Sequence, residues 1–354
     1  TSALTNVGKG SGNTATFDMS AGGNNTFVAG NGAASFSGSI AYTDGSGTDS
    51  LTFGASLAGG GAATFDMSLG GNNTLVAGED AAINSGSLSY TGGSGDDSLT
   101  FGISLAAVNG AAAFDLSAGG NNTLVAEDYA AISGGSIAYT GGSGDDSLTF
   151  GVDLAFGGGS ATFDMSAGGT NTLVAEDWAA SSGSLSFTGG SGDDSLTFGA
   201  GFALAGTATF DMSLGGDNTL VAGTSAGGIN GSIGYTGGTG VDTLTFGSEA
   251  AAFTGGYTID LGADTAVDKI TFQGSVGEMG GSVIIQNFDA TSTTGDTIRL
   301  EGIAVTSQLN IGGVAGGVLI SSTAGAATTI QMALDGNNAG DIDLTVVSGA
   351  VEIG

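Results

Sequence analysis

The chain has 354 residues, of which 72 are glycine, and it contains no proline, cysteine or histidine. Its 34 acidic residues stand against three basic ones, Lys9, Lys269 and Arg299, which gives a formal net charge of −31. This balance argues against nucleic acid or an anionic membrane surface as a partner, because both need basic patches. No apolar run is long enough for a membrane span. Without histidine and cysteine the usual general base, nucleophilic thiol and zinc ligands are missing, so we do not expect an enzyme.

Two related motifs alternate along the chain. FDMS or FDLS recurs in steps of 47 to 49 residues, with its aspartate at Asp18, Asp66, Asp115, Asp164 and Asp211. SAGGNNTLV at 117–125 aligns with GGSGDDSLT at 92–100, with Asn in place of Asp. The last acidic or amide residue of each turn therefore recurs every 23 to 25 residues, at Asn25, Asp49, Asn73, Asp97, Asn122, Asp146, Asn171, Asp194, Asn218 and Asp242, with weaker copies at Asp268 and Asp296. Such a regular period indicates a solenoid.

Each repeat carries two strand patterns. SLTF or TLVA follows the turn, and ATFDM or SLSYT comes about fifteen residues later, both with period-2 alternation. Stacked coils place equivalent residues about 4.8 Å apart, which predicts ladders of leucine (Leu51, Leu75, Leu99, Leu124, Leu148, Leu173, Leu196, Leu220, Leu244) and of aromatic residues (Phe17, Tyr42, Phe65, Tyr90, Phe114, Tyr139, Phe163, Phe187, Phe210, Tyr235). We predict an all-β, right-handed parallel β-solenoid of about 12 coils of about 24 residues. A flat coil of 48 residues stays open, since it would separate the Asp turns from the Asn turns.

The sequence changes character after the repeats. From residue 256 onward the glycine-rich turns become degenerate, and strand-like runs such as VLISS and DIDLTVV follow. We therefore predict repeats over residues 1–255, and degenerate last coils with a β-rich C-terminal cap over 256–354. A cap is expected because a solenoid needs an end that stops further strand addition. Simply more irregular coils are the alternative.

The turn GGSGDDSLT matches the nonapeptide G-G-x-G-x-D-x-U-x at every specified position. It resembles the RTX calcium-binding repeat of proteins exported by bacterial type I secretion, and the resemblance implies that the C-terminal region over 256–354 also holds the secretion signal. Calcium takes six to eight oxygens, backbone carbonyls among them, and glycines let a turn curl so that carbonyls converge. The resemblance implies a calcium ligand at Asp97, Asp146 and Asp194, and at Asp49 and Asp242 in looser copies. It also implies turn glycines at Gly92, Gly93, Gly95, Gly141, Gly142, Gly144, Gly189, Gly190, Gly192, Gly237, Gly238 and Gly240, further candidate ligands at Asp96, Asp145 and Asp193, and weaker sites at Asp268 and Asp296.

The chain departs from the RTX pattern in two ways. Only one nonapeptide occurs per 24 residues, whereas the family places two in each coil, and every second turn carries Asn. A Gly-Asp turn is also a common solenoid corner, and amides hydrogen-bond along a ladder without charge. Stacked carboxylates repel by on the order of a kcal/mol per pair. Calcium would remove this repulsion, so the resemblance predicts folding that depends on calcium.

A second acidic group recurs in three repeats: Glu79–Asp80, Glu127–Asp128 and Glu176–Asp177, the last followed by Trp178. Ordinary solvated loop charge explains it, and additional ions or contact with a neighbouring subunit are the alternatives.

These features together predict a secreted structural protein rather than a catalyst. The hypothesis is a calcium-dependent subunit of a bacterial surface layer or extracellular filament, outside the cell or on the bacterial surface. Its expected partners are further copies of the chain, with cell-surface polysaccharide as a further candidate. The alternatives are the calcium-stiffened stalk of an adhesin and the export domain of a secreted RTX enzyme.

Overall fold

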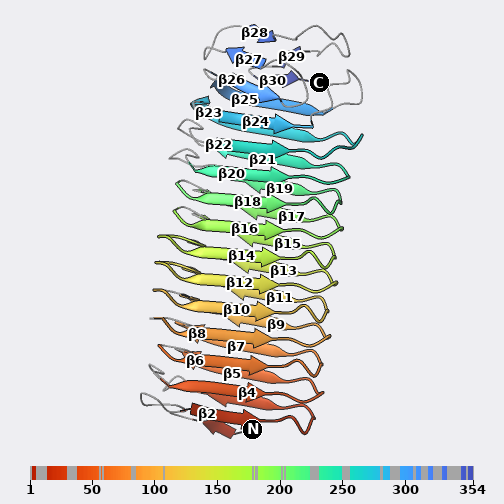
Figure 1. Ribbon diagram of the computed structural model, residues 1–354. Coiled ribbons are helices and arrows are strands. Elements are labelled where there is room, and N and C mark those ends of the chain that lie inside the picture. The colour runs from red at the N-terminus through yellow and green to blue at the C-terminus, as the bar shows by residue number, and fades with distance from the viewer. Residues whose placement is uncertain are drawn as a thin grey trace. The chain divides into compact units, whose positions relative to one another are not determined.

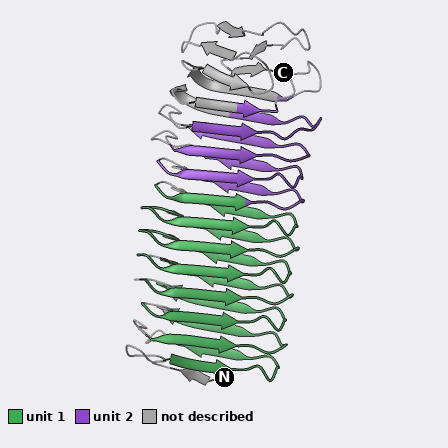
Figure 2. Ribbon diagram, in the orientation of Figure 1, with its two compact units in different colours: residues 1–187 green, residues 188–354 purple. Residues whose placement is uncertain are grey.

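The computed structural model describes residues 2–4, 14–29, 38–55, 57, 60–80, 85–106, 108–177, 179, 182–200, 202, 205–223, 231–248, 256–279, 282–287, 296–305, 308–311, 318–321, 329–332, 344–347 and 350–353. Every regular element in these ranges is a β-strand. No helix that could cross a bilayer occurs among them. The chain divides into two compact units, residues 1–187 and 188–354 (Figure 2).

In the first unit, the odd-numbered strands form one parallel sheet and the even-numbered strands form another (Figure 1). The odd-numbered sheet contains, in order, β1 (Ser2–Leu4), β3 (Thr26–Ala29), β5 (Ser50–Ala55), β7 (Thr74–Glu79), β9 (Ser98–Phe101), β11 (Thr123–Ala126), β13 (Ser147–Phe150) and β15 (Thr172–Ala175). The even-numbered sheet contains β2 (Thr14–Asp18), β4 (Ser39–Thr43), β6 (Ala62–Asp66), β8 (Ser87–Thr91), β10 (Ala111–Asp115), β12 (Ser136–Thr140), β14 (Ser160–Asp164) and β16 (Ser184–Thr188).

Successive coils of this unit align residue for residue. Leu124 of β11 pairs with Leu99 of β9 on one side and with Leu148 of β13 on the other. Tyr139 of β12 pairs with Phe114 of β10 in the same way. One coil thus contains two strands and one period of about 24 residues, which confirms the predicted parallel β-solenoid and excludes the 48-residue coil.

The core lies between the two sheets of each unit. Alternate strand residues point inward, as in β10, where Ala112 and Phe114 are buried while Ala111 and Ala113 are exposed. The aromatic rings of the two sheets meet in this core, and the ring centroids of Phe101 and Phe114 are 5.3 Å apart. Burial of one leucine and one aromatic ring per coil is what makes a flat 24-residue coil stable when stacked.

The second unit begins with the same arrangement. One sheet contains, in order, β17 (Ser195–Phe198), β19 (Thr219–Ala222), β21 (Thr243–Ser248), β23 (Lys269–Met279), β25 (Thr297–Val305), β30 (Ala350–Ile353) and β29 (Leu344–Val347). The other contains β18 (Thr207–Asp211), β20 (Ser232–Thr236), β22 (Gly256–Asp260), β24 (Ser282–Gln286), β26 (Gln308–Ile311), β27 (Val318–Ser321) and β28 (Thr329–Met332).

Regular coils end within the second unit. The step between equivalent turn residues lengthens to 26 residues from Asp242 to Asp268 and to 28 from Asp268 to Asp296. Pairing then changes from parallel to antiparallel, at β25 with β30 and at β26 with β27. The regular spacing therefore covers about nine turns, fewer than the 12 predicted. The predicted boundary at residue 256 lies at the start of β22, where pairing is still parallel.

Candidate functional site

The predicted ligand aspartates lie inside the turns that lead from an even-numbered strand to the next odd-numbered strand. We call this set the inner column: in the first unit Asn25, Asp49, Asn73, Asp97, Asn122, Asp146 and Asn171, and in the second unit Asp194, Asn218, Asp242, Asp268 and Asp296. Apart from Asn25, each of these side chains is at most 2% exposed. A polar group so deeply buried needs hydrogen-bond partners inside the protein.

The partners of the inner column come from the neighbouring coil. Oδ1 of Asp146 accepts hydrogen bonds from the backbone N–H of Asn122 at 2.9 Å and from its Nδ2 at 3.0 Å. The N–H of Asp146 in turn donates to Oδ1 of Asn171 at 3.1 Å. In the second unit Asn218 donates to Oδ1 of Asp242 in the same way. The inner column is thus a ladder of hydrogen bonds, in which a side-chain Oδ1 accepts the backbone N–H of the preceding coil.

The inner asparagines also form hydrogen bonds within their own turns. Nδ2 of Asn122 also donates to the carbonyls of Gly119 and Gly120, both at 3.2 Å. The amide therefore closes its own turn as well as the contact between coils. The Asn turns are thus hydrogen-bonded along the ladder, and the Asp turns belong to the same ladder.

The second carboxylate oxygen explains the first glycine of the turn. A Cβ at Gly141 would lie 2.3 Å from Oδ2 of Asp146, and one at Gly92 would lie 2.3 Å from Oδ2 of Asp97. The space that a side chain would need is already occupied by the carboxylate. The glycine is therefore required by packing, independently of any metal.

Sequence analysis missed the partner of this second oxygen. Coils with an inner Asp carry Tyr in the aromatic ladder, and coils with an inner Asn carry Phe; the exceptions are Phe187 in the Asp194 coil, and Ile259 and Ile285 in the coils of Asp268 and Asp296. Tyr42 Oη donates to Oδ2 of Asp49 at 2.7 Å. In the Asp194 coil the N–H of Gly190 bonds to Oδ2 of Asp194 instead, at 3.1 Å. The alternation of Tyr and Phe was visible in the sequence and could have indicated it.

Burial changes the acidity of these carboxyl groups. It raises the pKa of Asp97 to about 6, against the opposing effect of hydrogen bonds from Asn73 and Tyr90. It likewise raises the pKa of Asp242 to about 6. Oδ2 of Asp97 and the hydroxyl of Tyr90 nevertheless lack a hydrogen bond of good geometry. The neutral acid is therefore strongly populated in the folded turn near pH 6.

The first Asp turn has an additional carboxyl group. Asp44 occupies the position of the first glycine and is fully buried, and its Oδ2 has no hydrogen-bond partner of good geometry. Burial and the neighbouring Asp49 raise the pKa of Asp44 to about 7. The pKa of Asp49 is lowered, because hydrogen bonds from Asp44, Asn25 and Tyr42 together outweigh the effect of burial.

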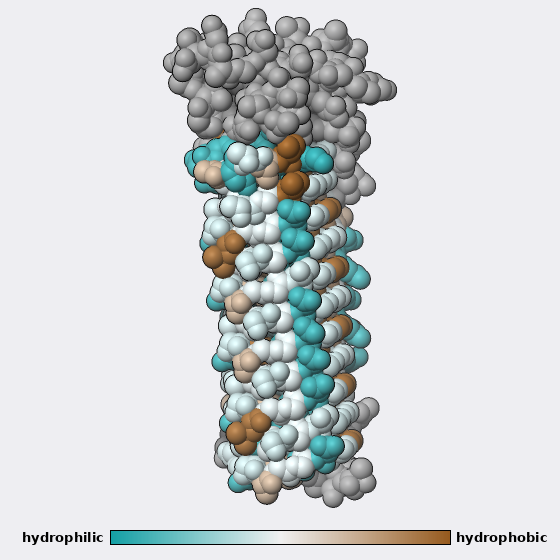
Figure 3. Space-filling model, turned by 90° about the vertical axis from the view of Figure 1, so that its right-hand side faces the viewer, coloured by the Kyte–Doolittle hydropathy of each residue, from teal (hydrophilic) through white to brown (hydrophobic). Residues whose placement is uncertain are grey.

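The residue before each inner position forms an outer column at the tip of the turn. It comprises Asn24, Thr48, Asn72, Asp96, Asn121, Asp145 and Thr170 in the first unit, and Asp193, Asp217 and Val241 in the second. Oδ1 of Asp96 accepts the N–H of Asn121 at 2.8 Å, and Oδ1 of Asp193 accepts that of Asp217 at 2.8 Å. All these residues are exposed, and Figure 3 shows hydrophilic residues gathered in a narrow column on this face.

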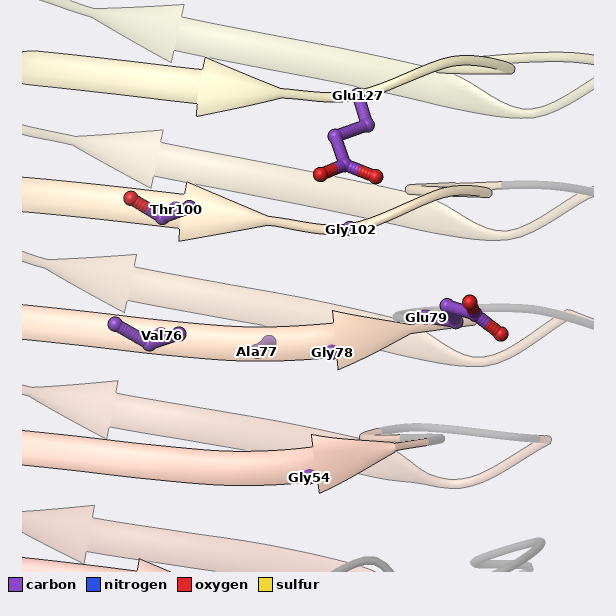
Figure 4. Close-up of a pocket in the computed structure, with 8 residues that line it drawn as sticks. All are labelled: Gly54, Val76, Ala77, Gly78, Glu79, Thr100, Gly102 and Glu127. Atoms are coloured by element: carbon purple, nitrogen blue, oxygen red, sulfur yellow. The ribbon is translucent and has the colours of Figure 1, made fainter.

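The second acidic group lies at the opposite end of the odd-numbered strands. Glu79 and Glu127 are exposed and border a hollow of about 470 Å³ whose floor is formed by Gly54, Gly78 and Gly102 (Figure 4). In this view the carboxylate of Glu127 extends over Gly102. Trp178 lies outside the described residues.

The geometry was tested against the predicted calcium ion. Oδ1 accepts a backbone N–H of the preceding coil at Asp49, Asp97, Asp146, Asp242, Asp268 and Asp296. Oδ2 of Asp97 and Oδ2 of Asp146 have no hydrogen-bond partner, and the neighbouring coils carry Asn in the inner column, whereas Asp242, Asp268 and Asp296 follow one another in successive coils. Among the described residues no group of three or more acidic side chains converges. Calcium binding at these positions stays a prediction.

No protein-family model matches the chain, and no curated protein or solved structure is significantly similar to it. The resemblance to RTX repeats is therefore carried by the nonapeptide alone and stays a hypothesis.

Proposed function

We propose that this chain is a structural protein that assembles with further copies of itself outside the cell, as the subunit of a surface layer or filament. The observation that supports this best is the uniformity of the coils. The same buried ladder and the same core residues recur in each regular turn, so the repeat supplies stiffness and a regular surface. The described hollow at Glu79 and Glu127 contains no nucleophile paired with a base.

The net charge of −31 sets a condition on such assembly. Copies of so acidic a chain repel each other unless cations lie between them. The carboxylates of Asp96, Asp145 and Asp193 are exposed at the tips of the turns, and only one oxygen of each serves the ladder. We propose that calcium acts at this outer column, between copies, where oxygens of two chains and water complete its coordination.

Electron microscopy and light scattering after addition of millimolar calcium test the proposal, with magnesium and a chelator as controls. We expect ordered arrays or filaments with calcium and dispersed protein with the chelator. Protein that stays dispersed at every calcium concentration would overturn the proposed function.

A matched pair of variants tests the place of the ion. The triple change Asp96→Asn, Asp145→Asn and Asp193→Asn keeps each Oδ1 and removes three charges from the outer column. Asp66→Asn, Asp115→Asn and Asp164→Asn remove three charges from the ends of even-numbered strands, where Oδ1 accepts the N–H of Ser68, Ser117 and Ser166. We expect only the first variant to lose assembly. Equal effects of both would show that net charge alone matters.

A further inference from the structure

Three asparagines of the outer column begin the same tripeptide. Asn24, Asn72 and Asn121 each stand in Asn-Asn-Thr, so that a threonine follows two residues later at Thr26, Thr74 and Thr123. Asn-x-Ser/Thr is the acceptor pattern of N-glycosylation and requires an accessible surface turn. A three-residue pattern often occurs by chance, so an acceptor site also requires that the asparagine amide is accessible in the folded turn.

The three side chains share one orientation at the tip of the turn. All are exposed, and their Oδ1 atoms accept the N–H of Thr48 at 3.0 Å, of Asp96 at 3.1 Å and of Asp145 at 2.8 Å. Within the described part of the chain, their Nδ2 atoms donate to no protein group. The reactive nitrogen of each amide is thus free at the surface.

The ladder does not need this nitrogen. Asp96 and Asp145 occupy the same column in the alternate coils and use only Oδ1 for the next coil. The inner asparagines differ, since Nδ2 of Asn122 donates to Asp146 and to two glycine carbonyls. A glycan on Nδ2 of an outer asparagine would leave Oδ1 and one N–H in place. Coil pairing is therefore compatible with the modification at the outer column and not at the inner one.

The hydroxyl of each acceptor pattern is also on the surface. Thr26, Thr74 and Thr123 are the first residues of β3, β7 and β11; Thr26 is exposed and the other two are half-buried. Their strand neighbours Phe27, Leu75 and Leu124 point inward. The threonines accordingly lie on the outer face of the sheet, next to the amide.

We propose that Asn24, Asn72 and Asn121 are N-glycosylation sites. In the transfer, Nδ2 attacks the anomeric carbon of a sugar that is activated by a diphosphate. The N–C bond forms, the C–O bond to the diphosphate breaks, and the lost amide proton passes to a base of the transferase. The lipid or nucleoside diphosphate leaves. Successive glycans would stand two coils apart, on the order of 10 Å, in a row along the turns.

The test uses two arms, because the activated sugar has two possible sources. In one, the full chain is produced through a secretory route that contains an oligosaccharyltransferase and a lipid-linked glycan. In the other, the folded chain is incubated with a soluble N-glycosyltransferase and a nucleoside-diphosphate hexose. Intact mass and tandem mass spectrometry of the intact glycopeptides locate the modified residues in both arms. We expect modification of Asn24, Asn72 and Asn121 in at least one arm and none at Asn73 or Asn122.

Variants at one site separate the acceptor pattern from folding. Thr74→Val should abolish modification of Asn72, Thr74→Ser should keep it, and Asn72→Asp should remove the acceptor while the ladder bond to Asp96 persists. Absence of modification in both arms, or modification of Asn72 that survives Thr74→Val, would overturn the proposal. The outcome of this glycosylation test does not depend on calcium-induced assembly, which is measured separately by electron microscopy.

Discussion

At the residue scale, the first glycine of the Asp146 turn, Gly141, lies where three parts of the repeat meet. A Cβ at Gly141 would lie 2.3 Å from Oδ2 of Asp146 and 2.7 Å from Sδ of Met165. The glycine, the aspartate five residues later and the buried methionine of the next coil therefore fill one space. A close-packed interior cannot admit another atom there without displacing a neighbour.

We predict that Gly141→Ala lowers local stability by about 1–3 kcal/mol, because the added methyl group collides with a carboxylate and a core side chain. Amide hydrogen exchange of β12 and β14 would measure the loss. Gly234→Ala is the control, since its Cβ would meet only Cγ2 of Thr209, at 3.8 Å, on the outer face of β20. That change should be neutral or stabilising by up to about 1 kcal/mol. Equal losses at both positions would contradict the packing argument.

At the scale of the coil, the aromatic ladder and the inner column vary together. Tyr139 accompanies Asp146, and Phe163 of the next coil accompanies Asn171. Tyr139 places a hydroxyl beside the buried carboxyl group of Asp146, whereas the amide of Asn171 already bonds to the carbonyls of its own turn. Tyr or Phe in the aromatic ladder is therefore linked to Asp or Asn in the inner column of the same coil.

We predict that Tyr139→Phe and Asp146→Asn are not additive. Tyr139→Phe alone should cost about 1–2 kcal/mol, because the buried carboxyl group of Asp146 loses the neighbouring hydroxyl. The double variant should recover most of this loss, since it recreates the combination found in the Phe163 coil. A double-mutant cycle on the local opening free energies from amide exchange gives the coupling. Strictly additive losses would show that the two positions are independent.

The period of the sequence was sufficient to predict the coil but not the inside of its turn. Equal spacing determines which residues align between coils, so the ladders of Leu148 and Tyr139 followed directly. It does not determine whether the carboxylate of Asp146 points into the turn or out of it, because this depends on the backbone angles at the glycines. The G-G-x-G-x-D pattern therefore suits a metal loop and a hydrogen-bonded corner equally well. After Asp242 the steps lengthen to 26 and 28 residues, so the regular part of the solenoid contains fewer coils than the period predicted.

At the scale of the whole molecule, the negative charge is divided between buried and exposed carboxylates. Exposed ones face water, where charge costs little. Desolvation raises the pKa of several buried ones, to about 6 at Asp97 and to about 7 at Asp268, whereas hydrogen bonds outweigh it and lower the pKa of Asp49. The ionisation of these turns is thus coupled to the stability of the fold.

We predict that the protein becomes less stable as pH rises from 5 to 8. The pKa of Asp97 is raised above its unfolded value of 3.8, so its contribution is complete below that value and is lost as pH rises through about 6. For Asp268 the loss extends through about 7. Melting temperatures by circular dichroism in excess chelator would measure the trend. A melting temperature that rises over this range would mean that the folded turns favour the ionised form.

Amide exchange at Asn122 tests the central claim, that side-chain oxygens of the inner column hold one coil to the next. Its N–H donates to Oδ1 of Asp146 at 2.9 Å. In excess chelator we predict a protected Asn122 amide in the unaltered protein and in Asp146→Asn, which keeps Oδ1, and fast exchange in Asp146→Ala. Protection that disappears on chelation, or that survives in Asp146→Ala, would contradict the account.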